Sequence, residues 1–134
     1  DLRAAGFVSS SPSAWLVEGL LPYLREIDVR RLFTQLSALA APGSALALDC
    51  AGADPFAVPA FARQAEKMRA RGIRMHFACD DPVRFLGPYG WNAERVGVAE
   101  LASRAGRALP FADDGDDDPL RSHLVTASRR ADRV

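Results

Sequence analysis

The chain has 134 residues, of which 49% are hydrophobic and 25% charged, and its formal net charge is zero. This length holds one globular domain, which we expect to span residues 1–134. The balanced charge and the lack of a basic cluster mixed with aromatic residues exclude nucleic acid as the predicted partner.

Targeting and metal signals are missing from the sequence. No apolar run has the length of a transmembrane helix, and residues 1–3 do not resemble a signal peptide, so we expect a cytoplasmic protein without a membrane partner. Cys50 and Cys79 lie far apart, with no Cys-x-x-Cys or Cys/His spacing, so no metal site is predicted. We interpret them as two buried thiols, because no spacing supports a disulfide between them.

The first predicted strand ends in a carboxylate, Glu18. Residues 1–13 are rich in Gly, Ser and Pro and predict a loop. The apolar run Ala14–Glu18 is typical of a strand covered on both faces, and Glu18 falls at its carboxyl end. A turn over Gly19–Leu24 follows, since Pro22 cannot sit inside a central ladder.

A strand–helix–strand unit continues from this turn. Apolar residues at helical spacing predict a helix over Val29–Ala40, with Asp28 as its N-cap. The second strand, Ala45–Asp49, is apolar and again ends in a carboxylate. Such crossovers are right-handed and parallel, so Glu18 and Asp49 should emerge at the same edge of the sheet, where ligands bind in open α/β sheets.

The rest of the chain predicts shorter elements. Alternation over Ile73–Phe77 indicates either a short edge strand or a loop that contributes to a pocket. Aspartates cluster in residues 113–118 without the spacing of a calcium loop, so we interpret them as a solvated charge run. The other predicted elements are helices over Pro59–Arg71, within Asp80–Tyr89 and over Glu100–Ala105, and strands over Asn92–Val98 and Ser122–Ser128.

The order of several motifs resembles the C-terminal half of class I S-adenosylmethionine-dependent methyltransferases. The closest likeness is to O-methyltransferases of bacteria related to leucine carboxyl methyltransferase. The string Glu-Gly-Leu-Leu-x-Tyr-Leu within Trp15–Leu24 is the most specific part of the resemblance. The other residues that carry it, in the family's order, are 5–7 (Ala-Gly-Phe), 41–44 (Ala-Pro-Gly-Ser), 90–91 (Gly-Trp), 100–102 (Glu-Leu-Ala) and 124–127 (Leu-Val-Thr-Ala).

This resemblance implies a Rossmann-like α/β fold with parallel strands, crossover helices and an antiparallel last strand. The first two strands of this chain would be the fourth and fifth of the family's seven-stranded sheet. The resemblance implies that Glu18 binds S-adenosyl-L-methionine near its methionine end and that Tyr23 lies near the methyl-transfer centre. Pro22 departs from the family, which has Met or another apolar residue there.

The front half of the family's pattern has no counterpart in this sequence. The Gly-rich cofactor loop, the ribose-binding acidic residue and the Asp-Leu pair beside the adenine all precede this region in the family. We therefore expect a fragment of a methyltransferase domain, inactive alone, whose parent transfers a methyl group to a small-molecule hydroxyl or carboxylate. The alternative is a non-catalytic interaction module that forms a homodimer through the exposed edge of its first strand.

Each candidate residue also has a structural interpretation. Glu18 could cap the first helix or pair with an arginine instead of binding a cofactor. Tyr23 could be half-buried packing, and Asp49 could be a substrate-side acid or, with more support, the cap of a loop. Isolated histidines are most often surface residues, although His76 stands where a general base could act; His123 is equally isolated in the sequence. Trp15 is interpreted as core.

Overall fold

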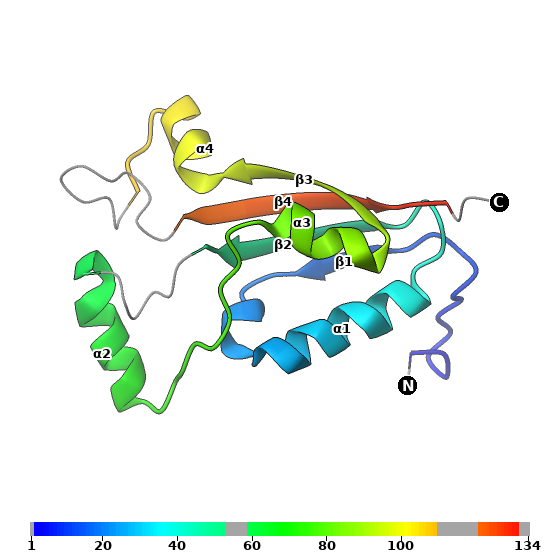
Figure 1. Ribbon diagram of the computed structural model, residues 1–134, viewed down its shortest axis with the longest axis horizontal. Helices are drawn as coiled ribbons and strands as arrows, with labels where there is room; N and C mark the ends of the chain where they lie inside the picture. Colours follow the sequence, from blue (N-terminus) through cyan, green and yellow to red (C-terminus); the bar gives the residue numbers. More distant parts are fainter. Residues whose placement is uncertain (1, 53–58, 110–120, 132–134) are drawn as a thin grey trace.

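The protein is built on one four-stranded sheet. The computed structural model describes residues 2–52, 59–109 and 121–131. Within these residues the sheet has the order β1-β2-β4-β3 (Figure 1). The strands are β1 (Ala14–Val17), β2 (Ala45–Ala51), β3 (Trp91–Gly97) and β4 (Ser122–Arg129). β1 and β2 are parallel, and β4 is antiparallel to both β2 and β3. The predicted α/β class with an antiparallel last strand is confirmed.

Helix α1 (Glu26–Leu39) makes the crossover from β1 to β2 and corrects the predicted start of this helix. The helix begins three residues before Val29, and its N-cap is Arg25 rather than Asp28. The carbonyl of Arg25 accepts from the amide of Val29 at 3.0 Å, which makes the first helical turn. Asp28 lies inside this turn, where a carboxylate stabilises the positive end of the helix dipole.

The remaining helices are short and lie near their predicted places. The predicted helix over Pro59–Arg71 is a 3₁₀ turn, η3 (Pro59–Phe61), followed by α2 (Ala62–Ala70). Asp81 caps the next helix through a bond from the Arg84 amide at 3.0 Å, and so is the observed one of the two caps, Asp80 and Asp81, that the sequence allows. The other helical elements are η1 (Leu21–Tyr23), α3 (Pro82–Leu86), η4 (Gly87–Tyr89) and α4 (Val98–Arg104). The aspartate run at 113–118 lies outside the described residues.

The core lies between one face of the sheet and helices α1 and α3 (Figure 1). Trp91 is completely buried and donates from Nε1 to the hydroxyl of Ser37 on α1 at 2.8 Å. Phe33, also completely buried, meets the ring of Phe85 edge-on at 5.5 Å between centroids. The strands supply alternate residues to this core: Val17, Leu46, Leu48, Cys50, Val125 and Ala127. Alternation follows from the two-residue period of a strand.

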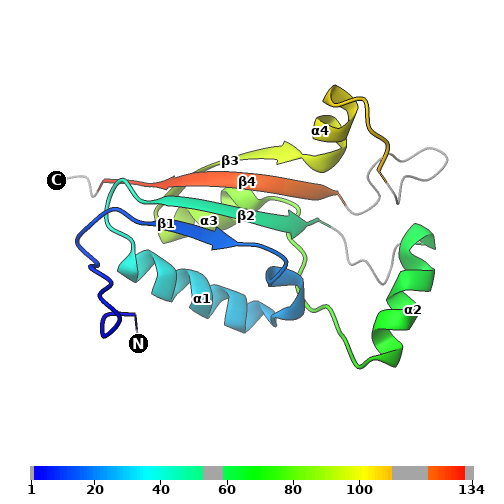
Figure 2. The same ribbon diagram turned by 180° about the vertical axis from the view of Figure 1, so that it is seen from behind.

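The opposite face of the sheet carries no helix over β1, β2 and β4 among the described residues (Figure 2). Leu16 of β1 is 70% exposed, and Leu124 of β4 is 44% exposed. β1 also lies at the end of the sheet and pairs with β2 alone. The predicted exposed edge of the first strand is therefore present. No described helix is both long and apolar enough to cross a membrane.

Candidate active site at the carboxyl edge of the sheet

Two carboxylates lie on neighbouring strands where β1 ends, two residues before the end of β2. The parallel register pairs Val17 with Leu48, so the next residues, Glu18 and Asp49, stand beside each other. Asp49 accepts a hydrogen bond at Oδ1 from the amide of Gly19, at 2.7 Å. Gly19 has φ +59°, a conformation that favours glycine, and the chain turns away from the sheet there. The two residues are neighbours as predicted, but the predicted end of the second strand at Asp49 is wrong, because β2 continues to Ala51 and Asp49 lies inside it. Asp49 holds the turn as a loop cap does.

Glu18 keeps its carboxylate exposed to solvent. It does not cap helix α1, whose N-cap is Arg25. The ion pairs found among the described residues join other groups: Arg25–Asp28, Arg30–Glu26, Arg104–Glu100 and Arg121–Asp80. Neither structural interpretation of Glu18 therefore holds within this part of the chain, and its charge is available to a cationic ligand.

Tyr23 lies in η1, the 3₁₀ turn that follows β1. Leu21 of this turn is only 3% exposed and anchors it in the core, whereas Tyr23 is 45% exposed. Pro22 occupies an early position of the turn, where its missing amide costs no hydrogen bond. The Pro22 carbonyl accepts from the amides of His76 at 2.7 Å and Phe77 at 3.4 Å. This backbone bond fastens His76 to the residue that precedes Tyr23, which the sequence alone does not reveal.

The segment 73–80 runs across this edge of the sheet as an extended loop. It is not a strand, but its residues alternate between partly buried and exposed, which explains the strand-like pattern in the sequence. Cys79 donates its amide to the carbonyl of Ala51 at 2.8 Å, and Phe77 packs on Phe85 with ring centroids 5.6 Å apart. Residues Met75–Ala78 line a small hollow of about 130 Å³. Of the two predicted alternatives, the loop beside a pocket is the one observed.

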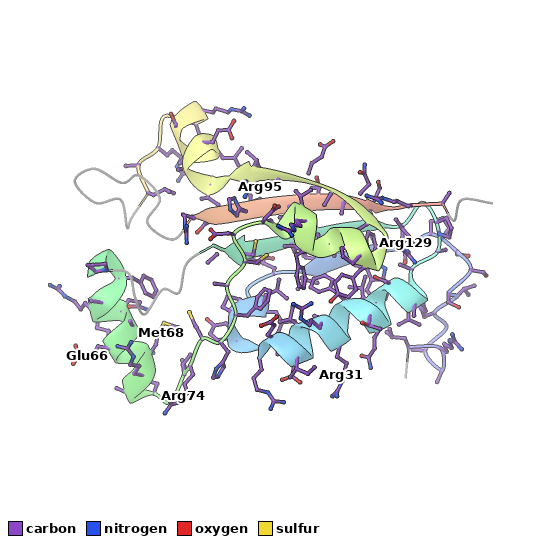
Figure 3. The ribbon with its side chains drawn as sticks, in the orientation of Figure 1. Arg31, Glu66, Met68, Arg74, Arg95 and Arg129 are labelled. Carbon is purple, nitrogen blue, oxygen red and sulfur yellow. The ribbon has the colours of Figure 1, made fainter. Side chains whose placement is uncertain are left out.

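A cluster at the far end of the same edge was missed by sequence reasoning. Arg95 of β3 donates from Nη1 to the carbonyl of Asp80 at 2.6 Å and lies 3.1 Å from Nε2 of His123. Arg121 pairs with the Asp80 carboxylate at 3.2 Å and donates to the Gly52 carbonyl at 2.9 Å (Figure 3 labels Arg95). His123, isolated in the sequence, thus has Arg95 as a neighbour in the fold. The signal that the sequence offers is the antiparallel last strand. Because β4 runs opposite to β2, its first residues lie beside the carboxyl end of β2.

The two cysteines lie at this edge as free thiols. Burial raises the pKa of the Cys50 thiol to about 12, with the nearby Cys79 and Asp49 adding to the effect. Burial also raises the pKa of Cys79. Cys50 is buried as predicted, whereas Cys79 is only partly buried. Both thiols are therefore protonated near neutral pH, which makes them poor nucleophiles. The described residues contain no group of three or more His, Cys, Asp or Glu side chains that could hold a metal ion.

Comparison with known proteins gives this edge a context. Residues 1–37 match the sequence profile of the leucine carboxyl methyltransferase family. A Mycobacterium avium protein, named provisionally as an S-adenosyl-L-methionine-dependent methyltransferase, is 36% identical over 96% of this chain and 45% of its own length. A protein of the same name from Mycobacterium marinum is 39% identical over 89% of this chain and 41% of its own length. The resemblance to S-adenosylmethionine-dependent methyltransferases is confirmed.

Solved structures of such proteins share this fold. A DUF574 family protein from Streptomyces avermitilis matches 94% of this chain and 47% of its own length, with a TM-score of 0.64 and 19% identity. A structure from Thermobifida fusca, titled provisionally as a methyltransferase, matches 96% of this chain and 47% of its own length, with a TM-score of 0.60 and 22% identity. The chain therefore spans about half the length of the methyltransferase relatives that it matches.

Proposed function

We propose that this chain is the back half of an S-adenosyl-L-methionine-dependent methyltransferase that methylates an oxygen of a small molecule. The observation that carries the proposal is the carboxylate of Glu18, which lies next to Asp49, is exposed and has no ion pair among the described residues. It lies at the carboxyl edge of β1, in a sheet shared with a solved structure titled provisionally as a methyltransferase. Relatives named as S-adenosyl-L-methionine-dependent methyltransferases, alike over nearly the whole chain, support the choice of cofactor.

Glu18 fits the charge of this cofactor. The cofactor carries an ammonium group and a sulfonium, and an exposed carboxylate at a strand end complements positive charge. In the proposed role Glu18 binds the ammonium group, while Asp49 fixes the backbone of Gly19 and so the direction in which the site opens. When bound, the cofactor supplies an electrophilic methyl group. The residues of this chain that fit the cofactor would contact only the amino-acid end of the cofactor.

The acceptor side of the proposed site comprises Tyr23 and the extended segment 73–80. Tyr23 is exposed enough to contact a substrate, and the backbone of His76 is bonded to the carbonyl of Pro22, the residue before Tyr23. The hollow along Met75–Ala78 is lined by both polar and apolar atoms, and His76 is one of its residues. A hydroxyl acceptor would give its proton to a base, a role open to His76, whereas a carboxylate acceptor needs none. The protein otherwise contributes by aligning acceptor and methyl group and by excluding water.

Cofactor binding by a chimaera tests this proposal. We expect the 134-residue chain alone to bind S-adenosylhomocysteine too weakly for titration calorimetry at micromolar concentrations, because most of the family's cofactor contacts lie outside it. We expect the same chain, joined to the part of the Mycobacterium avium protein that it does not match, to bind it. In this chimaera Glu18→Gln should weaken binding about tenfold, the usual scale for a lost charge-assisted bond.

Glu66→Gln, on the surface of α2, is the matched control and should leave the affinity unchanged. Micromolar binding by the isolated chain would refute its description as a half. Equal affinities for the parent chimaera and its Glu18→Gln variant would refute the role of Glu18.

A non-catalytic dimerisation module is the second candidate. The observation that favours it is the open edge of β1, because unpaired strand edges pair with other chains. Light scattering on the eluate of a size-exclusion column separates the two candidates. A stable dimer that binds no S-adenosylhomocysteine, either as the isolated chain or within the chimaera, would support the dimerisation module.

A further inference from the structure

A second hollow lies at the edge of the sheet opposite to Glu18. It opens where α1 ends, where β2 begins and where β4 ends, and the N-terminal loop borders it. Its volume is about 470 Å³, within the range of small-molecule sites. Its polar lining residues are Ser9, Ser10, Ser37, Arg129 and Arg130, and three alanines and a proline around the end of α1 complete the wall. We call it the arginine hollow.

The arginine hollow offers positive charge and hydrogen-bond donors to a ligand. The ion pairs of the described residues involve neither Arg129 nor Arg130. Its lining, as far as the chain is described, contains no Asp or Glu. Guanidinium groups and hydroxyls bind oxyanions, because each anionic oxygen accepts several charge-assisted hydrogen bonds. An anion is therefore the ligand that this set of side chains fits.

Arg129 is held in place before any ligand arrives. Its Nη1 donates to the Tyr89 carbonyl at 2.8 Å and its Nε to the Ala40 carbonyl at 3.4 Å, which leaves Nη2 without an acceptor among the described residues. Its guanidinium carbon lies 6.0 Å from the centre of the buried Trp91 ring. Gly90 leaves room for this group, since a Cβ there would collide with Nη1. The same charge offsets the negative end of α1, which would otherwise repel an anion.

Ser37 adds a donor from the helix. Its hydroxyl is buried and accepts from Nε1 of Trp91 at 2.8 Å. A hydroxyl that accepts one hydrogen bond still has its own proton to donate. Ser9 and Ser10 bring two more hydroxyls from the N-terminal loop. The arginine hollow thus has a donor-rich side and an apolar side of alanines and proline, which suits an organic anion.

We propose that the arginine hollow binds a small phosphorylated organic molecule. The phosphate lies between Nη2 of Arg129, the guanidinium of Arg130 and the serine hydroxyls, and the organic part lies on the alanines. A phosphate monoester has nearly two negative charges at neutral pH and three acceptor oxygens, which match two guanidinium groups. The site is at the edge of the sheet away from Glu18, so this ligand differs from the methyl donor and the methyl acceptor. Bound there, it ties the N-terminal loop to α1 and β4.

Binding can be followed through Trp91. The chain contains two tryptophans, so in a Trp15→Phe chain the fluorescence reports Trp91 alone, which contacts Ser37. The probe is phenyl phosphate, which joins a phosphate to an apolar ring. We expect a saturable change in fluorescence with a Kd of about 1 mM or lower. Titration calorimetry of the unsubstituted chain should give the same affinity, and phenyl phosphate should raise its melting temperature.

Arg130→Gln is the decisive variant. The side chain of Arg130 is exposed, so its substitution should leave the fold intact, and it should weaken binding of phenyl phosphate about tenfold. Arg31→Gln is the matched control, because it removes the same charge from an exposed position of α1 outside the arginine hollow. Figure 3 labels both Arg31 and Arg129. The control should leave the affinity unchanged, and circular dichroism confirms that both variants are folded.

Related compounds test each part of the proposed ligand. Inorganic phosphate lacks the ring, phenol lacks the phosphate and benzoate carries a single charge, so each should bind about tenfold more weakly than phenyl phosphate. Any of them that binds as tightly as phenyl phosphate overturns the assignment to phosphorylated organic molecules. The absence of saturable binding of phenyl phosphate below about 10 mM, or equal weakening by Arg130→Gln and Arg31→Gln, overturns the site itself.

Discussion

The two faces of the sheet differ although the same strands make both. On the covered face, the one that packs on α1 and α3, Phe33, Trp91 and Val125 are between 0% and 2% exposed. On the bare face, the opposite one, Leu16 of β1 is 70% exposed and Leu124 of β4 is 44% exposed. The covered face is closed by α1 and α3, which follow β1 and β2 in the chain, whereas no described helix covers the β1–β2 part of the other face.

The difference between the faces indicates which residues contribute most to the free energy of unfolding. Burial of apolar surface is the main favourable term in folding, so residues of the covered face should carry most of the free energy of unfolding. Residues of the bare face contribute little until something covers them. Glu18, which follows β1, and Asp49 of β2 are neighbours next to the open edge of the sheet.

The largest expected effect is on the covered face. Phe33→Ala leaves a cavity between α1 and the rings of Phe85 and Tyr89, and should cost about 3–5 kcal/mol of unfolding free energy. Urea denaturation followed by circular dichroism measures it. Ile27→Ala on the same helix is the control and should change stability by less than about 0.5 kcal/mol. Similar losses for both substitutions would contradict the assignment of the core.

The hydrogen bond between Ser37 and Trp91 should matter next. Ser37→Ala leaves the buried indole N–H of Trp91 without its acceptor, at a cost of about 1–3 kcal/mol. Urea denaturation monitored by tryptophan fluorescence gives the value. Ser103→Ala, at an exposed position of α4, should be neutral by comparison. An unchanged midpoint for Ser37→Ala would mean that the indole finds another partner.

On the bare face a drastic change in polarity should have little effect on the isolated chain. Leu16→Thr keeps a side chain suited to strands and loses no burial, so the unfolding free energy should shift by less than about 0.5 kcal/mol. The measurement is the same urea titration. A loss as large as that for Phe33→Ala would show that Leu16 is already covered, as in a dimer, and would end the contrast between the faces.

The smallest effect belongs to the first turn of α1. The hydrogen bond from Arg25 lowers the pKa of the Asp28 carboxyl, so this ion pair stabilises the fold above the unfolded-state pKa and loses its effect as pH falls through the lowered value. Asp28→Asn should therefore lower the melting temperature slightly near neutral pH and not at strongly acidic pH. Melting curves from about pH 3 to pH 7 check this.

Glu94→Gln, on an exposed position of β3, is the matched control for the loss of one carboxylate. A melting temperature that falls equally in both variants would assign the effect to net charge and not to the Arg25–Asp28 pair.

The sequence by itself determined the local elements and the meeting of the carboxylates. An apolar run, a helix-spaced stripe and a second apolar run predict one parallel unit, because each pattern matches one backbone period and crossovers have one hand. Glu18 and Asp49 then had to share an edge. The sequence misplaces the start of α1, since Asp28 is a preferred type of N-cap residue and Arg25 is not, and only the backbone bond from Val29 shows that the helix begins earlier.

The tertiary structure alone decided the contacts between distant segments. The segment of His76 is joined to the turn of Tyr23 because its backbone donates to the Pro22 carbonyl, and backbone bonds of this kind leave no pattern in side chains. Arg95, Asp80 and His123 converge because β4 is antiparallel and returns to the carboxyl edge. The bare face was likewise decided in three dimensions: an apolar run predicts a strand covered twice, and only the packing shows which cover this chain supplies.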